Sequence, residues 1–348
     1  MRLGVMVDYS DDFAAAAEEV RAAERIGVDL VAVAEAYSFD AVSRLGYLAA
    51  VTERVTLMSA ILQVYSRTAA LIGMTAAGLD DVSGGRFELG IGASGGQVVE
   101  GFHGVPFVAP LTRIRETVAA CRLLWRREPV VVDGTQVRIP LPPDAGAGRG
   151  KPLRLVNHPR RDRIPVTIAA LSPKSVAQTA EIADGWMPVF FHPERAGAAW
   201  GAALAEGRAR RADDLGPLDV HVTVPLLIGD GPAVDAALAA YRARLALYLG
   251  GMGAKGANFY TDLATRYGYG DAAALVQDRY LAGDKRGAAD AVPEDLVRAT
   301  SLIGDEAHVR DRVDALAAAG VTTLTVQVLA PSGRLDQLEA LRAVLPAS

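Results

Sequence analysis

Short apolar runs alternate along the chain with segments in which apolar residues recur at every third or fourth position. The first pattern predicts buried strands and the second predicts amphipathic helices. Eight strands are expected, at residues 3–8, 29–35, 55–62, 86–92, 165–170, 185–191, 219–228 and 321–328. Helices are expected at residues 11–26, 40–53, 68–82, 111–126, 173–183, 193–212, 232–249, 305–319 and 333–344. Eight strands with helices between them predict an α/β fold, a closed (β/α)8 TIM barrel.

The chain is longer than a minimal barrel requires. The basic fold takes about 250 residues, which leaves about a hundred of the 348 residues to place elsewhere. Residues 128–164 contain a predicted hairpin around the turn Asp133-Gly134, and residues 250–303 are rich in glycine and tyrosine without a clear strand. We expect both stretches to be insertions in one domain that spans residues 1–348.

Composition and charge exclude several classes of function. The formal net charge is −5 and there is no basic stripe, so we expect a small-molecule substrate and no nucleic-acid partner. Charges interrupt every apolar run before the roughly 18 residues that a membrane helix needs, so no membrane partner is expected. The single cysteine, Cys121, and the acid at position 8, where a signal peptide would stay apolar, predict a cytoplasmic protein.

The segment from Gly90 to Gly95 matches the G-x-G-x-x-G dinucleotide fingerprint. In a Rossmann site the last glycine opens a helix and the motif follows the first strand. Here the motif falls on the fourth predicted strand, and the next clear helix starts near Leu111, so we expect no Rossmann site. Glycines at the carboxyl-terminal end of a barrel strand let backbone amides approach a ligand. A ligand loop is therefore expected over residues 92–96, with a plain turn as the alternative.

Five segments together resemble the bacterial luciferase-like superfamily. They are AEAYSFDA (34–41), ERVTLMSAILQVYSRTAA (53–70), LDDVSGGRFELGIGASGGQVVEGFHGVPF (79–107), AALSPKSVAQTAEIADGWMPVFF (169–191) and YLGGMGAKGANFYTDLATRYGY (248–269). The resemblance is to the branch that uses coenzyme F420, a deazaflavin, and that includes methylenetetrahydromethanopterin reductase-like oxidoreductases. It covers nearly the whole chain and implies a barrel with insertions, usually assembled as a homodimer.

The resemblance also implies where the cofactor binds. A non-prolyl cis peptide bond between Ala60 and Ile61 would lie behind the cofactor ring. The residues expected to line the ring are Ser59, Ala60, Ile61, Gln63, Gly92, Ala93, Ser94 and Gly95. Those expected near the cofactor phosphate are Ala170, Leu171, Ser172, Pro173 and Lys174. Proline suits the first turn of a helix, whose free amides attract anions, and this supports the phosphate site. A simple helix cap at Ser172 is the alternative.

Hydride transfer also needs a proton donor. Acids at strand ends are the candidates, and Glu35 is the first choice, with Asp8 and Tyr37 as further catalytic candidates. Well-studied deazaflavin dehydrogenases of this family carry Asp-His at the second strand, whereas this chain has Glu35-Ala36. The alternative role for Glu35 is an ion pair that closes the mouth of the barrel.

Four residues are expected to contact the substrate, namely His103, Lys255, Asn258 and Tyr260. No metal site is expected, because the five histidines lack the spacing of metal ligands. The favoured hypothesis is a coenzyme F420-dependent oxidoreductase that acts on an activated C=C or C=N bond. The alternatives are a monooxygenase that uses flavin mononucleotide (FMN) and a non-catalytic protein that binds flavin or deazaflavin.

Overall fold

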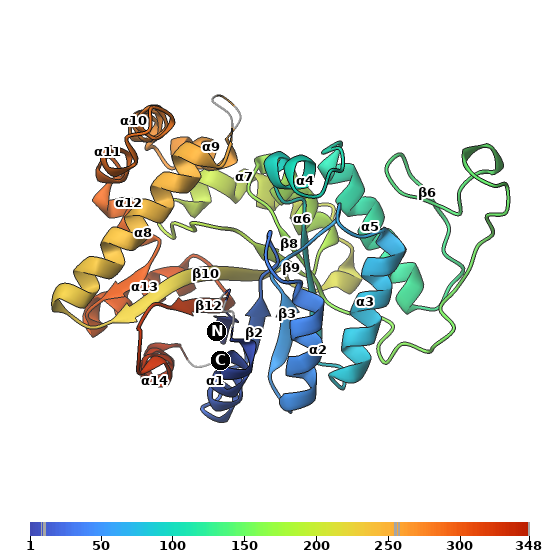
Figure 1. Cartoon of the computed structure of the whole chain (residues 1–348), viewed down its shortest axis with the longest axis horizontal. Coiled ribbons are helices and arrows are strands. Elements are labelled where there is room, and N and C mark those ends of the chain that lie inside the picture. Colours follow the sequence, from blue (N-terminus) through green and yellow to red (C-terminus); the bar gives the residue numbers. More distant parts are fainter. Residues whose placement is uncertain (8, 10–11, 254–255, 257, 347–348) are drawn as a thin grey trace.

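The computed structural model describes the chain except for residues 8, 10–11, 254–255, 257 and 347–348. Its centre is a closed barrel of eight parallel strands, which confirms the predicted fold (Figure 1). In barrel order these are β1 (Arg2–Val7), β2 (Leu30–Val33), β3 (Thr56–Ser59), β5 (Phe87–Gly92), β8 (Val166–Ala169), β9 (Gly185–Met187), β10 (Asp219–Ile228) and β12 (Thr323–Val328). The barrel closes where β10 pairs with both β9 and β12.

The nine predicted helices are present and surround the barrel. They are α1 (Phe13–Arg25), α2 (Ala41–Val51), α3 (Ala69–Val82), α5 (Pro110–Trp125), α6 (Pro173–Ile182), α7 (Ala196–Arg208), α8 (Gly231–Gly251), α13 (Glu306–Ala318) and α14 (Arg334–Val344). Several begin at a side-chain cap that satisfies a first-turn amide. Asp40 accepts from the Ser43 amide at 2.9 Å, and Asp305 accepts from the His308 amide at 2.8 Å.

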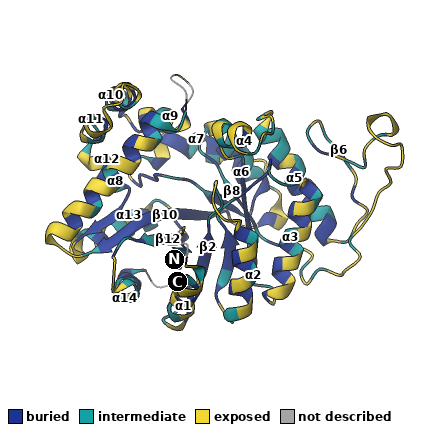
Figure 2. Cartoon of the chain, in the orientation of Figure 1, coloured by how far each residue is buried: buried dark blue, intermediate teal, exposed yellow. Residues whose placement is uncertain are grey.

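The core lies inside the barrel and between the barrel and its helices. All four residues of β2 are buried, as expected of a strand covered on both faces. Figure 2 shows the same pattern around the barrel, with buried strands and with helices that are exposed on their outer sides. The lone Cys121 is fully buried on α5, and burial raises the pKa of its thiol to about 12. This thiol therefore packs as a small apolar group.

The structure corrects four details of the sequence analysis. The third predicted strand is interrupted after Ser59 and resumes as β4 (Leu62–Gln63), which pairs with β5. The sixth predicted strand ends at Met187, because Pro188 has no amide to donate to a ladder. A short helix, α4 (Gly96–Gly101), directly follows the glycine loop, where the sequence analysis expected none. The second insertion ends in a strand, β11 (Leu302–Gly304), which pairs with β10.

The first insertion forms an arm that projects away from the barrel in Figure 1. The hairpin predicted around Asp133-Gly134 is present as β6 (Val132–Asp133) and β7 (Arg138–Ile139), which pair antiparallel. A single turn of 3-10 helix follows, η1 (Pro143–Ala145), and a second one, η2 (Asp213–Leu215), follows α7. The arm carries no predicted site residue.

The second insertion is helical. It consists of α9 (Phe259–Arg266), α10 (Gly270–Leu281), α11 (Lys285–Asp290) and α12 (Glu294–Ala299). These helices follow the carboxyl-terminal end of α8, and α9 lies near α7 and α4 on the upper side of Figure 1, beyond the carboxyl-terminal ends of the strands. The insertion therefore covers one side of the barrel mouth.

The amino-terminal end of the barrel is closed by a polar cluster. The Arg2 guanidinium pairs with Glu88 at 2.8 Å and with Asp219 at 3.0 Å, and it also donates to the Thr323 hydroxyl. Since this end is filled, a ligand of the barrel has to bind at the opposite, carboxyl-terminal end.

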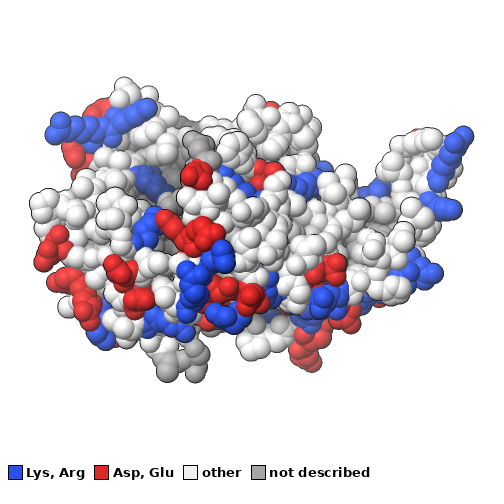
Figure 3. Space-filling model, turned by 60° about the horizontal axis from the view of Figure 1, so that its bottom comes forward, with Lys and Arg blue, Asp and Glu red and all other residues white. Residues whose placement is uncertain are grey.

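The charges of the surface are mixed rather than segregated. On the face seen in Figure 3, acidic and basic side chains lie interspersed over the barrel, and basic side chains also mark the tip of the arm. In the described part of the chain, no helix has the length and apolar character that would let it cross a membrane.

Candidate active site

The cis peptide bond expected between Ala60 and Ile61 is present at the carboxyl-terminal end of β3. The Ser59 hydroxyl bridges to β5 there, donating to the Gly90 carbonyl at 2.9 Å and accepting from the Gly90 amide at 3.0 Å. Ser59 is fully buried and its hydroxyl is occupied by these bonds. Its role is therefore to join the two strands beside the bulge, whereas Ala60 and Ile61, which follow the end of β3, are only partly buried.

The glycines of the fingerprint have two different functions in the fold. A Cβ atom at Gly90 would lie 1.9 Å from the Ser59 carbonyl oxygen, and one at Gly92 would lie 2.8 Å from the Ile61 side chain. These two glycines allow β5 to pack against the bulge. At Gly95 a Cβ atom would meet nothing within 4 Å. Gly95 therefore faces open space at the mouth, where a ligand could approach the backbone.

Ser94 lies between these glycines with a left-handed backbone. Its φ is 61°, a conformation that non-glycine residues adopt rarely and that tends to occur at functional loops. Phe190, in the loop after β9, has a φ of 52°. Both unusual backbones thus follow barrel strands at their carboxyl-terminal ends, the end at which barrel enzymes bind their substrates.

Gln63 and His103 are in direct contact at the mouth. Gln63 Nε2 donates to His103 Nε2 at 2.5 Å, which assigns the proton of a neutral His103 to Nδ1. Gln63 is only 2% exposed, and its Oε1 atom is buried without a hydrogen-bond partner among the described residues. A buried carboxamide oxygen of this kind is costly unless a ligand or a water molecule donates to it.

The turn before α6 is held firmly in place. The Leu171 carbonyl accepts from the Trp200 indole at 2.8 Å and from Arg266 Nη2 at 2.9 Å, and the Ala170 carbonyl accepts from the Trp186 indole at 2.9 Å. Ser172 is the N-cap of α6, with its hydroxyl accepting from the Ser175 amide at 3.2 Å. The helix cap stated as the alternative for Ser172 is thus present, and the first turn of α6 presents its positive end at the mouth.

Glu35 is held by an ion pair. Arg67 donates to both of its carboxylate oxygens, and the hydrogen bond from Nη2 to Oε2 is 2.8 Å long. The Ala41 amide at the start of α2 also donates to Oε2, at 2.9 Å. The two side chains are 8% and 15% exposed. The carboxylate also raises the pKa of Arg67 above its usual range. This geometry favours the alternative stated for Glu35, an ion pair that closes the mouth, over a proton donor.

Aromatic rings surround the rest of the mouth. Tyr37 is exposed after β2, and its ring lies 6.3 Å from that of Phe102, which packs edge-on against His103 at 5.1 Å. On the opposite side, Phe190 packs edge-on against Tyr248 at 5.0 Å and Tyr260 at 5.9 Å. Burial raises the pKa of Tyr260, which therefore stays protonated near neutral pH.

The substrate residues expected in the second insertion do not behave alike. Tyr260 lies in the aromatic cluster just described, whereas Asn258 caps α9. The Asn258 carboxamide donates to the carbonyls of Tyr248 and Leu249 and accepts from two amides of α9, so none of its hydrogen-bonding capacity is left for a substrate. Lys255, and the catalytic candidate Asp8, lie outside the described residues.

Sequence reasoning did not find several residues at the mouth. These are Arg67, Phe102, Phe190, Tyr248 and Arg244. Arg67 pairs with an acid 32 positions away, and no local pattern marks such a partner. The sequence did offer one signal for Arg67. It follows Gln63 closely, directly after the bulge, and could therefore have been expected at the mouth. In the described part of the chain no cluster of three or more potential metal ligands is found.

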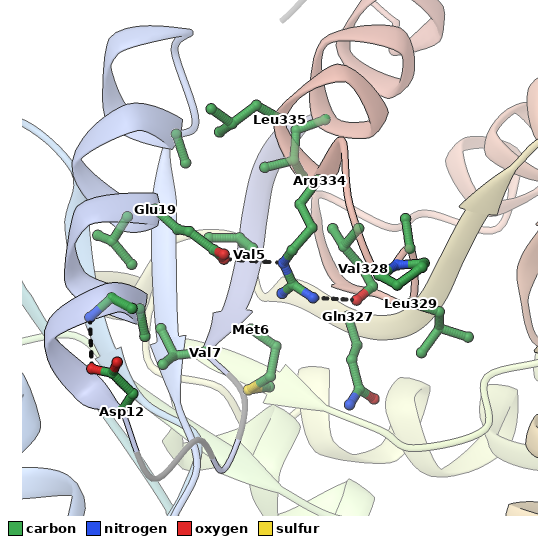
Figure 4. Close-up of a pocket in the computed structure, with 17 residues that line it drawn as sticks. Val5, Met6, Val7, Asp12, Glu19, Gln327, Val328, Leu329, Arg334 and Leu335 are labelled. Carbon is green, nitrogen blue, oxygen red and sulfur yellow. Dashed lines mark hydrogen bonds and ion pairs between the residues drawn. The ribbon is translucent and has the colours of Figure 1, made fainter.

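A cavity of about 490 Å³ lies outside the barrel wall between α1 and α14. Figure 4 shows that apolar side chains of β1 and β12 line its floor and that an ion pair between Glu19 and Arg334 crosses it. None of the described site residues named above lines this cavity. It approaches the mouth only at Gln327, a lining residue near the end of β12 that accepts a hydrogen bond from Arg244.

Comparisons with known proteins agree with this architecture. Residues 1–323 match the luciferase-like monooxygenase family. The chain is 39% identical to Rv3520c of Mycobacterium tuberculosis, provisionally named a coenzyme F420-dependent oxidoreductase, over 99% of both chains. The coenzyme F420-dependent tetrahydromethanopterin reductase of Methanopyrus kandleri has the same fold, with a TM-score of 0.78 at 23% identity over 99% of this chain and 98% of that one. A type II Baeyer-Villiger monooxygenase of Pseudomonas putida in complex with FMN has a TM-score of 0.65 at 18% identity, over 98% and 96%.

Proposed function

We propose that this chain, which belongs to the luciferase-like monooxygenase family, is a coenzyme F420-dependent oxidoreductase that reduces an activated C=C or C=N bond of a small organic molecule. The similarity to Rv3520c extends over 99% of both chains and supports the choice of coenzyme. The observation that carries the proposal is the Gln63 carboxamide, which is buried two residues after the cis peptide bond. Its oxygen atom has no hydrogen-bond donor among the described residues.

The residues at the mouth fit a planar, phosphorylated ring system. The backbone of Ala60 and Ile61 offers a flat surface at the end of β3, and Gly95 leaves open space along β5. Gln63 Oε1 can accept from a ring N–H group. These three features would hold the deazaflavin ring, with Gly92, Ala93 and Ser94 along its edge.

The turn from Ala170 to Lys174 would hold the cofactor phosphate. Amides in the first turn of a helix have no partner within the helix, and the helix dipole favours an anion there. Lys174 is exposed on the first turn and adds a positive charge. The rigid hydrogen bonds to the Ala170 and Leu171 carbonyls keep this turn in position without the ligand.

When bound in its reduced form, the deazaflavin supplies a hydride to one carbon of the acceptor bond. The neighbouring atom of that bond gains a proton, so C=C becomes CH–CH and C=N becomes CH–NH. The Arg67 guanidinium and the Ala41 amide occupy both oxygens of the Glu35 carboxylate, which suits it to position the start of α2. Among the described catalytic candidates this leaves Tyr37, whose ring neighbours that of Phe102, to donate the proton.

Titration of the purified protein with each cofactor tests the proposal. We expect coenzyme F420 fluorescence to be quenched on binding while FMN fluorescence stays unchanged. Oxidation of the reduced deazaflavin in the presence of a panel of enones, imines and unsaturated acids then tests the reductase activity. Tight binding of FMN without binding of coenzyme F420 would contradict the proposal and support the flavin monooxygenase reading, which the resemblance to the FMN complex favours. Binding of coenzyme F420 without turnover of any acceptor would support a non-catalytic role.

We also propose that the protein is a cytoplasmic homodimer. Apolar side chains are exposed on the outer faces of two neighbouring helices, Tyr47 on α2 and Leu71, Met74 and Val82 on α3 (Figure 2). Several large apolar side chains on adjoining helices often mark an interface. Light scattering after size-exclusion chromatography checks this, because a monomer at micromolar concentration would contradict it.

A further inference from the structure

Arg244 brings a positive charge to the mouth of the barrel. It lies on α8, and its Nη1 atom donates to Gln327 Oε1 at 2.6 Å. Gln327 is near the carboxyl-terminal end of β12, so this contact draws the guanidinium over the strand ends. The guanidinium carbon also lies 5.9 Å from the centre of the Tyr248 ring, which belongs to the aromatic cluster of the mouth.

No carboxylate among the described residues pairs with Arg244. Other arginines near the mouth are paired with acids, as Arg67 is with Glu35 and Arg195 with Asp295. Partial loss of hydration raises the pKa of Tyr9 and burial raises that of Tyr260, and the charge of Arg244 acts on both hydroxyls in the opposite direction. The positive charge therefore acts across the mouth without an acid of the described chain to neutralise it.

Three aromatic side chains at the mouth, one of them close to Arg244, are largely exposed. The exposed fractions are 57% for Tyr9, 63% for Tyr37 and 64% for Phe102. Tyr9 lies close enough to Tyr37, Tyr248 and Arg244 for its pKa to respond to each of them. Large exposed rings gathered at the mouth of a barrel are typical of a surface that packs against a flat, apolar ligand.

From this juxtaposition we infer that the substrate is an unsaturated or aromatic carboxylate whose anionic group binds Arg244 and whose planar body packs against Tyr9, Tyr37 and Phe102. This inference rests on the proposed function and names its substrate class. A guanidinium binds a carboxylate through two parallel hydrogen bonds, which fixes the orientation of the substrate as well as its position.

The charge of Arg244 would also stabilise the substrate during the reduction itself. In an unsaturated acid with the C=C bond next to the carboxylate, hydride adds to the carbon farther from the carboxylate, and the resulting negative charge is shared by the carboxylate until a proton reaches the nearer carbon. A fixed positive charge stabilises that build-up. Arg244 would therefore support the reduction step as well as binding, and the atoms balance as one hydride and one proton added across the double bond.

The test uses cinnamate, 2-naphthoate and benzoate, with cinnamamide as the neutral counterpart of cinnamate. Calorimetric titration of the protein loaded with coenzyme F420 should show binding of the acids and at least tenfold weaker binding of cinnamamide. In Arg244→Ala the affinity for the acids should fall at least tenfold, to the level of the amide, which itself should be unaffected. Arg244→Lys should recover part of the loss. Arg310→Ala, which removes an exposed arginine of α13, is the matched control and should change neither affinity.

Three outcomes would overturn the inference. The first is that none of the acids binds, and the second is that Arg244→Ala weakens the amide as much as the acid. The third is that Arg244→Ala weakens coenzyme F420 itself, which would assign the guanidinium to the cofactor. If Arg244 served only to pin α8 to β12, Gln327→Ala would lower the melting temperature as much as Arg244→Ala and the acids would bind no better than the amide.

Failure of the proposed function has a different signature. It would appear in the titration with coenzyme F420 alone, before any acid is added. Benzoate binding to the protein without cofactor would still be measured in that case. Retention of that binding, with loss in Arg244→Ala, would support the anion subsite by itself.

Discussion

The carboxylate of Glu35 forms an ion pair with the guanidinium of Arg67, 32 positions further along the chain. A third hydrogen bond comes from the Ala41 amide at the start of α2. Both oxygens of this nearly buried carboxylate are thus occupied by hydrogen bonds, two of them from a charged donor. Glu35 therefore connects the end of β2, the start of α2 and the loop that carries Arg67, and these three segments form one side of the mouth.

We predict that Glu35→Ala destabilises the fold more than it alters the chemical step. The substitution leaves the nearly buried Arg67 without its partner, and breaking a buried pair from one side costs about 3–5 kcal/mol. Urea denaturation monitored by circular dichroism measures this change. Arg67→Ala should cost a similar amount, and the double variant should cost less than the sum, because the two side chains share one interaction.

The pH profile of turnover separates this role from proton donation. If Glu35 only positions the mouth, Glu35→Gln should retain the shape of the wild-type profile. Loss of one limb of the profile in Glu35→Gln, with the fold intact, would instead restore Glu35 as the proton donor.

We predict that Ser172→Asp weakens the binding of coenzyme F420 at least tenfold while the fold is preserved. Aspartate caps a helix as well as serine does, so α6 should remain stable. Its negative charge would repel a phosphate at the first turn of α6. Fluorescence titration measures the affinity, and an unchanged melting temperature shows that the helix is intact.

Two charge reversals provide the comparison for this prediction. Lys174→Glu should weaken the cofactor in the same direction, whereas Lys285→Glu, on α11 in the second insertion, should not. Equal affinity of Ser172→Asp and the wild type would show that the phosphate binds elsewhere.

The contrast between what the sequence predicted and what it missed has a physical cause. The eight barrel strands are buried on both faces, so each appears as an apolar run that is visible without any tertiary information. The helix α4 has glycine at each end and only one fully buried side chain, Val99, so its pattern is too weak to detect. The ion pair of Glu35 and the position of Arg244 depend on contacts between distant segments, which no local pattern encodes.

We predict that Gln63→Leu lowers the affinity for coenzyme F420 about tenfold and changes stability by no more than about 1 kcal/mol. Leucine removes the hydrogen bond to His103 but also a buried oxygen atom that lacks a protein partner, and the two effects on the free fold partly cancel. The bound state loses a hydrogen bond, for which about 1.4 kcal/mol corresponds to tenfold in affinity. An affinity equal to that of the wild type would exclude Gln63 from the cofactor site.

We predict that acid destabilises the fold partly through His221. This imidazole is fully buried in the barrel, with Nε2 2.6 Å from the Thr325 hydroxyl, and burial lowers its pKa from 6.5 to about 4. Asp219 raises this pKa and Arg2 lowers it further. The unfolded chain therefore takes up a proton at a higher pH than the folded chain does. The stability that the neutral imidazole provides is complete above about pH 6.5 and is lost as the pH falls towards 4.

Thermal unfolding from pH 7 to pH 4 measures this dependence. The shift corresponds to an upper bound of about 3 kcal/mol, and His221→Asn should remove that part of the loss while the carboxylates continue to titrate. If the wild type and His221→Asn lose the same stability over this range, His221 does not contribute.

The two outer glycines of the fingerprint should respond in opposite ways to the same substitution. A Cβ atom at Gly90 would lie 1.9 Å from the Ser59 carbonyl oxygen, a backbone atom of the adjoining strand β3 that cannot move aside. We therefore predict that Gly90→Ala lowers stability by more than about 3 kcal/mol or prevents folding.

At Gly95 the added atom meets nothing within 4 Å, and the backbone φ of −122° suits alanine. Gly95→Ala should fold normally and weaken the binding of coenzyme F420, because the methyl group occupies space next to the ring. Melting temperatures and cofactor titrations of the two variants measure both effects. A stable Gly90→Ala would contradict the packing of β5 against the bulge, and unchanged cofactor affinity in Gly95→Ala would show that the ring does not lie along this loop.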